Sequence, residues 1–100
     1  MKTLGTHNYY VYILTNKSKT VLYIGITNNI QNRMAYHAKR TNRKSFTSKY
    51  NCFFLIYIEQ FNDVNTAIKR EKQLKGWSRK KKEALIQITN PNWTFLNDTI

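Results

Sequence analysis

Two tyrosines, an arginine and a histidine have the types and spacing that suit a phosphate site. Tyr12 and Tyr23 lie in two aromatic and β-branched segments, and Arg33 and His37 follow, four residues apart. A planar guanidinium binds phosphate oxygens in bidentate fashion. Two alternatives stay open: Arg33 extends into solvent from the edge of a helix, and His37 is a buried structural histidine. Taken together, the four residues favour the phosphate site.

The two tyrosines belong to a predicted β-hairpin. Residues 9–15 and 21–26 are rich in β-branched and aromatic side chains, and only the polar residues 16–20 separate them. A four-residue loop at 16–19 pairs Thr15 with Thr20 and Tyr12 with Tyr23, on one face of the sheet. Gly25 follows on that face and offers bare backbone to a closely approaching group. We expect this face to form the floor of the site.

A helix over residues 29–40 is predicted to place the other two side chains above this floor. Ile30, Arg33, Met34 and His37 follow helical spacing and form one stripe. Such a stripe faces inward and is normally apolar. The two polar members are therefore expected to lean over Tyr12 and Tyr23.

A second predicted helix begins after Asn62 or Asp63 and ends at Gly76. Glu71 lies on its apolar stripe, which consists of Val64, Ala67, Ile68, Glu71 and Leu74. A carboxylate that faces a core needs a partner or a cation. One interpretation is a structural ion pair with Arg33. The other is Mg²⁺, which accepts one carboxylate together with waters and substrate phosphate oxygens.

The remaining segments complete an α+β prediction. Residues 41–51 are polar and basic and are expected to form an exposed loop, whereas the apolar run at 52–59 is typical of a buried, central strand. Ser78 begins a third helix that runs to about residue 89. The predicted order is β-β-α-β-α-α, a three-stranded antiparallel sheet flanked by helices, in one domain of residues 1–100.

The charge of the chain indicates a polyanionic partner. Lys and Arg number 17 against 5 acidic residues, a net charge of +12. Nucleic acid explains this excess better than a solvated surface or an anionic membrane does. One cysteine, Cys52, and the polar residues 3–8 fit a cytoplasmic protein. Besides Gly25, the candidate nucleic-acid-binding residues are Arg40, Arg43, Lys44, Lys72, Lys75, Arg79, Lys80, Lys81 and Lys82.

The pattern resembles the GIY-YIG nuclease superfamily. Tyr23-Ile24-Gly25 is the intact second motif of that family, and Tyr10-Val11-Tyr12 stands where the first motif, G-I-Y, is expected. The resemblance continues through Arg33 to Glu71 and is closest to small, stand-alone, bacterial-type members. It implies a divalent-metal-dependent endonuclease that hydrolyses phosphodiester bonds, in DNA rather than RNA, with repair or recombination as the expected process.

The resemblance also implies a role for each site residue. Tyr12 or Tyr23 positions or deprotonates the attacking water, and Arg33 binds the scissile phosphate. His37 assists proton transfer or holds a tyrosine, and Glu71 binds one Mg²⁺ or Mn²⁺. A late asparagine completes the site; Asn90 is favoured, with Asn92 and Asn97 as alternatives.

We expect the tyrosines, the two side chains of the first helix and the Glu71 carboxylate to converge in one cleft. The alternative function is a non-catalytic nucleic-acid-binding module on the same scaffold. An RNA- or ribosome-associated structural protein would also explain the charge.

Overall fold

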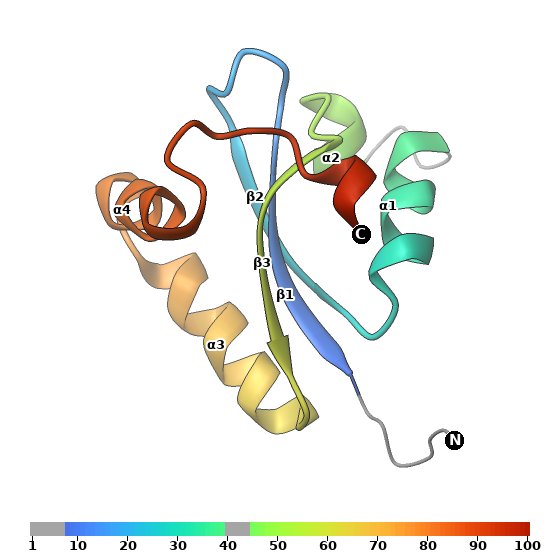
Figure 1. Cartoon of the computed structure of the whole chain (residues 1–100), viewed down its shortest axis with the longest axis vertical. Helices are drawn as coiled ribbons and strands as arrows, with labels where there is room; N and C mark the ends of the chain where they lie inside the picture. The colour runs from blue at the N-terminus through green and yellow to red at the C-terminus, as the bar shows by residue number, and fades with distance from the viewer. Residues whose placement is uncertain (1–7, 40–44) are drawn as a thin grey trace.

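An antiparallel sheet of three strands lies in the middle of the molecule, with helices on both faces (Figure 1). The computed structural model describes residues 8–39 and 45–100. The strands are β1 (Tyr9–Thr15), β2 (Leu22–Thr27) and β3 (Phe54–Phe61), in the order β2-β1-β3. The helices are α1 (Ile30–Lys39), α2 (Phe46–Lys49), α3 (Val64–Gly76) and α4 (Arg79–Thr89), followed by the 3-10 helix η1 (Asn97–Thr99). The predicted fold class is confirmed, and α2 is an addition to the predicted order.

The central strand is β1, so the prediction that residues 52–59 form it is wrong. β1 and β3 are both continuous apolar runs, and composition does not distinguish them. The outer side of β3 is covered by the C-terminal segment. Leu96 N–H donates to the Leu55 carbonyl at 2.7 Å, while Asn97 Oδ1 accepts from Leu55 N–H at 2.9 Å. Although β3 is an edge strand, its residues Leu55, Ile56 and Tyr57 are buried.

The register of the hairpin differs from the prediction by two residues. Thr15 pairs with Leu22, and Tyr12 pairs with Gly25 instead of Tyr23. Because side chains alternate with a period of two along a strand, a two-residue shift returns each side chain to its original face. Tyr12 and Tyr23 therefore still share the face that was expected, although they are not directly opposed.

The shift arises in the loop, which spans residues 16–21. The Asn16 side chain organises it, because Oδ1 accepts from the N–H groups of Thr20, at 2.8 Å, and Val21, at 3.1 Å. The Val21 carbonyl in turn accepts from the Thr15 hydroxyl at 2.8 Å. These contacts keep Thr20 and Val21 in the loop. Val21 was predicted to begin the strand because its side chain is β-branched, but β2 begins at Leu22.

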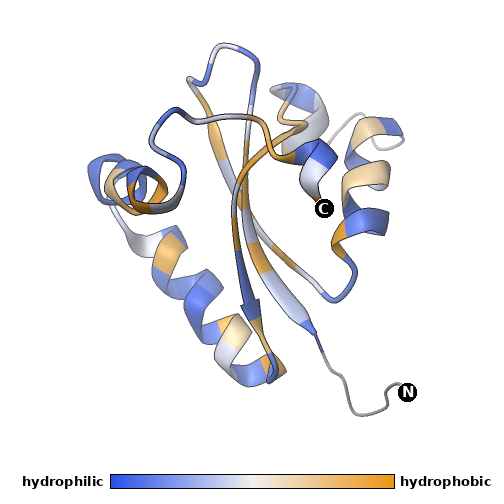
Figure 2. Ribbon diagram, viewed as in Figure 1, coloured by the Kyte–Doolittle hydropathy of each residue, from blue (hydrophilic) through white to orange (hydrophobic). Residues whose placement is uncertain are grey.

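Each face of the sheet has its own apolar core. α3 and α4 cover one face, where the buried residues are Val11, Ile13, Ile24, Ile56, Tyr57, Ala67, Leu74 and Ile86. α1 covers the other, where they are Tyr12, Leu14, Ile30, Met34, Cys52 and Leu55. Figure 2 shows orange positions along the strands between these layers. The α1 stripe is buried at Ile30, Met34 and His37, whereas Arg33 is exposed.

The predicted starts of α3 and α4 are confirmed. Asp63 caps α3, accepting from Thr66 N–H at 2.8 Å, and Ser78 caps α4, accepting from Lys81 N–H at 3.2 Å. α3 contacts all three strands. Within the described ranges, no helix has the length and apolar character needed to span a membrane.

Candidate active site

Tyr12 projects from β1 toward the α1 layer and is buried, with 1% of its surface exposed. Its ring lies over Gly25, its partner on β2. A Cβ added at Gly25 would lie 3.0 Å from the ring Cε1 and closer still to Cζ and the hydroxyl oxygen. Gly25 was predicted to contact nucleic acid. In the structure, Tyr12 itself occupies the space that the missing side chain leaves.

His37 holds the Tyr12 hydroxyl from above. Its Nε2 lies 3.1 Å from that hydroxyl, and its Nδ1 lies 3.0 Å from the hydroxyl of Thr47 in α2. Burial, and then the charge of Arg33, lower the pKa of His37 to about 4, so the ring is neutral at neutral pH. A neutral imidazole has one N–H, so one ring nitrogen donates and the other accepts. A hydroxyl on each side can match either tautomer.

The Tyr12 hydroxyl is held in its protonated form. Burial is the main reason that its pKa is raised; the nearby Tyr23 and Glu71 act in the same direction, and Arg33 opposes them. A phenol in this state is a poor base at neutral pH. It can still donate a hydrogen bond to a ligand when His37 donates its Nε2–H to the phenol oxygen.

Tyr23 lies beside this pair, with its ring centroid 6.4 Å from that of Tyr12 and 5.8 Å from that of His37. It is half-buried. Within residues 8–39 and 45–100, its hydroxyl has no hydrogen-bond partner, whereas that of Tyr12 is bound to His37. The two tyrosines are therefore unequal: Tyr12 is fixed, and Tyr23 keeps a hydroxyl available for a ligand.

Arg33 supplies positive charge at the margin of the same face. Its guanidinium lies 5.6 Å from the centroid of the Tyr36 ring, and the side chain is exposed. Its charge lowers the pKa values of both His37 and Tyr12. It also borders an open cavity of about 460 Å³ that is lined by Thr27, Asn28, Asn29, Asn32, Arg33 and Tyr36.

Glu71 approaches from the other layer, because α3 packs on the sheet face opposite α1 (Figure 1). A second cavity, of about 280 Å³, is lined by Arg33 and by Ile68 of α3, with Ile26 of β2 between the layers. Glu71 is three residues beyond Ile68, on the same side of α3. Its charge acts on Tyr12 around the β2 edge. The structure therefore brings Tyr12, Tyr23, Arg33 and His37 together on one side of the sheet, whereas Glu71 belongs to the helix that covers the other side.

The partner of Glu71 is Lys75, not Arg33. Lys75 Nζ lies 3.2 Å from Glu71 Oε2, and the two side chains are 54% and 15% exposed. The proposed structural pair of Glu71 with Arg33 is thus absent from the described residues. The described residues contain no group of three or more His, Cys, Asp or Glu side chains able to hold a metal. Glu71 is a single, mostly shielded carboxylate.

Asn90 is buried, and its side-chain amide is hydrogen-bonded to backbone groups. Its Nδ2 donates to the carbonyls of Ile56 and Thr94, both at 2.9 Å, and its Oδ1 accepts from Thr94 N–H at 2.9 Å. Ile56 is the residue that the β1–β3 ladder skips, between the pairs Ile13–Tyr57 and Leu14–Leu55. Asn90 thus satisfies a carbonyl left by a bulge. Asn97 is likewise engaged with β3 backbone.

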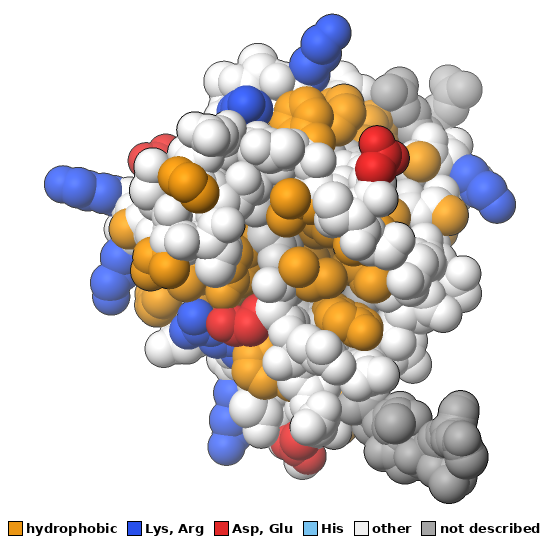
Figure 3. All heavy atoms as spheres, in the orientation of Figure 1, with side chains coloured by type: hydrophobic (Ala, Val, Ile, Leu, Met, Phe, Trp, Pro, Cys, Tyr) orange, Lys and Arg blue, Asp and Glu red, His pale blue; other side chains and the backbone are white. Residues whose placement is uncertain are grey.

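The predicted basic residues fall into three groups. Arg40, Arg43 and Lys44 lie outside the described residues. Lys72 and Lys80 are exposed, Lys82 is half-buried, Lys75 pairs with Glu71, and Lys81 Nζ lies 5.1 Å from the Trp77 ring centroid. Figure 3 shows Lys and Arg side chains projecting around the margin of one face, with hydrophobic side chains in its middle.

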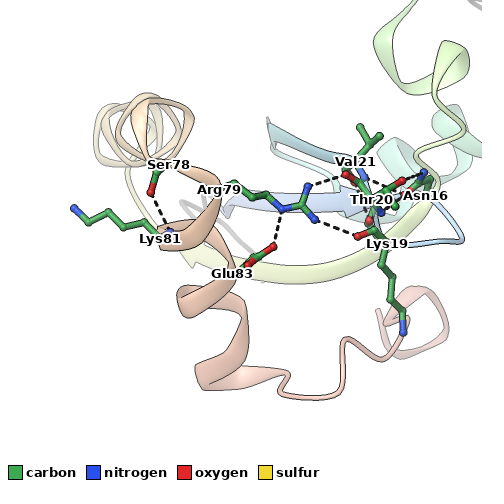
Figure 4. Close-up of polar contacts among 9 residues, drawn as sticks. Asn16, Lys19, Thr20, Val21, Ser78, Arg79, Lys81 and Glu83 are labelled. Carbon is green, nitrogen blue, oxygen red and sulfur yellow. Dashed lines mark hydrogen bonds and ion pairs between the residues drawn. The ribbon is translucent and has the colours of Figure 1, made fainter.

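Arg79 forms the third group, because its guanidinium binds other parts of the chain (Figure 4). Nε donates to Glu83 at 2.9 Å, and Nη1 and Nη2 donate to the carbonyls of Thr20 and Lys19 at 2.8 and 3.1 Å. These contacts join α4 to the hairpin loop. Arg79 therefore has a structural role in this fold, and its predicted contact with nucleic acid stays a prediction.

Residues of α2 also belong to the site, although the sequence did not predict them. Thr47 is 3% exposed and binds His37, and Phe46 stacks on Tyr23 with ring centroids 5.8 Å apart. A signal was present: Ser45 is a good helix cap, and Phe46 and Tyr50 have helical spacing. A single turn embedded in a polar segment is too short for periodicity to reveal.

Comparisons with known proteins match most of this chain to one family. The family model described as the GIY-YIG catalytic domain matches residues 8–84. A UPF0213 protein of Natronomonas pharaonis is 35% identical over 79% of this chain and 91% of its own length. One from Staphylococcus haemolyticus is 34% identical over 79% and 94%. The solution NMR structure of a UPF0213 protein from Bacillus halodurans has a TM-score of 0.57 and 29% identity, covering 92% of this chain and 93% of that one.

Proposed function

The chain belongs to the GIY-YIG family, and on that premise we propose that it is a metal-dependent endonuclease that hydrolyses phosphodiester bonds in DNA. The single observation that carries the proposal is the fixed Tyr12–His37 pair, 3.1 Å apart, with the open hydroxyl of Tyr23 and the charge of Arg33 beside it. Membership of a nuclease family supports the reaction class. The net charge of +12 supports a nucleic-acid substrate.

Arg33 binds the scissile phosphate in this proposal. It is exposed, borders a cavity of about 460 Å³, and has no acidic partner within the described residues. Its planar fork can contact two phosphate oxygens at once. Negative charge that develops on these oxygens during hydrolysis is offset by a guanidinium already in place.

The two tyrosines have different roles. Tyr12 remains protonated and donates a hydrogen bond to the phosphate or to the attacking water, with His37 holding its oxygen. Tyr23 orients that water and takes part in removing its proton, because its hydroxyl has no competing partner among the described residues. When the Thr47 hydroxyl donates to Nδ1, the proton of His37 is on Nε2, from which it donates to the Tyr12 oxygen.

Glu71 is the group that would hold a divalent cation. A single carboxylate suits Mg²⁺ or Mn²⁺, which keep waters and take further ligands from substrate phosphates. Lys75 is an exposed partner four residues away, and such pairs contribute only about 0.3–0.5 kcal/mol, so a cation can displace it. When bound, the metal would polarise the phosphate and stabilise the leaving oxygen.

A second candidate function is a nucleic-acid-binding module without catalysis. The observation that favours it is the location of Glu71 on α3, across the sheet from α1. A module of this kind needs the basic surface but not a cation beside the phosphate.

Cleavage assays separate the two functions. Labelled single-stranded, duplex and branched DNA and matched RNA are incubated with the protein in Mg²⁺, Mn²⁺ or EDTA. We expect Tyr23→Phe to lower the cleavage rate by about 10²–10⁴-fold with little change in melting temperature. Tyr10→Phe makes the same change at a tyrosine of β1 that has no proposed role in the site, and it is the matched control. If the unmodified protein cleaves none of these substrates with either metal, the nuclease proposal fails and the binding module remains.

The metal ligand has its own control. Glu71→Gln keeps size and hydrogen-bonding capacity but removes the charge that attracts a cation. We expect it to abolish cleavage and to preserve folding and DNA binding in EDTA. Asp98→Asn makes the same charge change at an exposed position and should leave cleavage unchanged. Equal cleavage by the Glu71 variant and this control would remove Glu71 from the site.

A further inference from the structure

A row of aromatic rings leads from the candidate site to the surface. The Phe46 ring stacks on Tyr23, with centroids 5.8 Å apart and planes inclined by 29°. Tyr50 follows, with its centroid 4.7 Å from that of Phe46. Both outer rings come from the segment around α2 and are 45% and 41% exposed. The row begins at a tyrosine of the site and ends in solvent.

Contacts other than the Phe46 and Tyr50 rings hold α2 in place. α2 is held by Thr47, which is buried against His37, and by Cys52 N–H, which donates to the Thr47 carbonyl at 2.9 Å. Ser45 caps the turn by accepting from Ser48 N–H at 3.2 Å. Isolated exposed apolar side chains are common on protein surfaces. Two adjacent rings in contact with a site residue are a different feature, because they form one continuous surface.

Positive charge accompanies this aromatic surface. Lys49 Nζ lies 5.5 Å from the centroid of the Tyr50 ring, and Arg33 lies 5.6 Å from that of Tyr36, a third exposed ring near the site. Aromatic faces stack on nucleobases, and cations beside them contact the sugar-phosphate backbone. In a duplex, each base is already stacked and paired, so its face is not available to a protein ring.

We propose that Phe46 and Tyr50 form a stacking subsite for an unpaired nucleobase next to the scissile phosphate. The substrate class that follows is nucleic acid with unpaired nucleotides, either a single strand or the unpaired part of a branched molecule. The position beside the scissile phosphate rests on the proposed nuclease function. The stacking itself does not, because binding can be measured without catalysis.

The test is equilibrium binding in EDTA to a single-stranded oligonucleotide that contains 2-aminopurine, whose fluorescence is quenched by stacking. We expect quenching with the unmodified protein and tighter binding than to the matched duplex. Phe46→Leu keeps an apolar side chain but removes the ring, and should weaken binding by about 5- to 150-fold. Phe46→Trp should retain binding. Ile88→Ala, which alters a side chain 78% exposed on α4, should have no effect.

Salt titrations separate stacking from charge. Because stacking releases no counterions, the ratio of affinities of the unmodified protein and Phe46→Leu should stay constant across salt concentrations, whereas Lys49→Ala should lower the salt slope by about 0.7. The proposal is overturned if the protein binds single strand and duplex equally. It is also overturned if Phe46→Leu has an unchanged thermal melt and binds single strand as well as the unmodified protein does. This second result would indicate that the exposed rings bind a protein partner instead. Stacking without cleavage under any metal condition would retain the subsite and reject the nuclease.

Discussion

Gly25→Ala tests whether the contact between Gly25 and Tyr12 determines the geometry of the site. The new Cβ would lie 3.0 Å from Tyr12 Cε1 and nearer to Cζ and the hydroxyl, so the buried ring must move. Overpacking of this kind costs about 1–3 kcal/mol, and loss of the hydrogen bond to His37 adds about 1 kcal/mol. We expect unfolding free energy to fall by about 2–4 kcal/mol, each kcal/mol lowering Tm by about 4–8 °C.

A double-mutant cycle with Tyr12→Phe identifies the cause. Removing the hydroxyl removes the atom that an alanine at Gly25 would meet first, so the double variant should be more stable than the sum of the two single effects predicts, by about 0.5–3 kcal/mol. Urea denaturation of the four proteins gives this coupling energy. Gly76→Ala is the matched control: apart from its own chain neighbours and the local helix backbone, nothing lies within 4 Å of the added Cβ, and we expect no loss of stability. Additive effects, or a Gly25→Ala variant as stable as its parent, would refute the reasoning.

Three further predictions concern pH, the α4 contact and charge. The pKa of His37 is about 4 in the folded protein and 6.5 in the unfolded chain, so between pH 6.5 and about pH 4 only the unfolded chain binds a proton at this residue. The free energy of unfolding should therefore fall by up to about 3 kcal/mol as the pH decreases through this range. Urea denaturation at several pH values should show this loss, and His37→Gln should reduce it. Arg79→Ala should cost about 1–2 kcal/mol by freeing the hairpin loop from α4; unchanged stability with weaker DNA binding would return Arg79 to the interface. Replacing Lys80, Lys81 and Lys82 with alanine should reduce the salt slope of DNA binding by about 2–3, and an unchanged slope would exclude this cluster.

The face of each strand was easier to predict than its register. Alternation fixed Tyr12 and Tyr23 on one face, because a side chain changes face only when the pairing shifts by an odd number of residues. The register depended on the Asn16 side chain, which binds Thr20 and Val21 and lengthens the loop. Such a contact is formed in three dimensions and leaves no periodic signal in the sequence.

The candidate site shows the same division. Helical spacing was sufficient to bring Arg33 and His37 over the sheet, since both belong to the helix that follows the hairpin directly. For Glu71, spacing identified the inward side of α3 but not the face of the sheet that α3 covers. The contacts of Asn90 could not be predicted from the sequence either, because they depend on the bulge at Ile56, which interrupts an otherwise regular strand.

The hydrogen bonds between β3 and the C-terminal segment have a consequence for folding during synthesis. Leu55 can pair with β1 as soon as β3 is made, but its outward N–H and C=O groups find their partners only at Asn97 and Leu96. A nascent chain therefore carries an unprotected strand edge at Leu55, whose partner Asn97 lies 42 residues further along the chain. Exposed edges of this type recruit other strands. Chains that end before residue 96 should thus aggregate more readily than the loss of a few surface contacts alone would suggest.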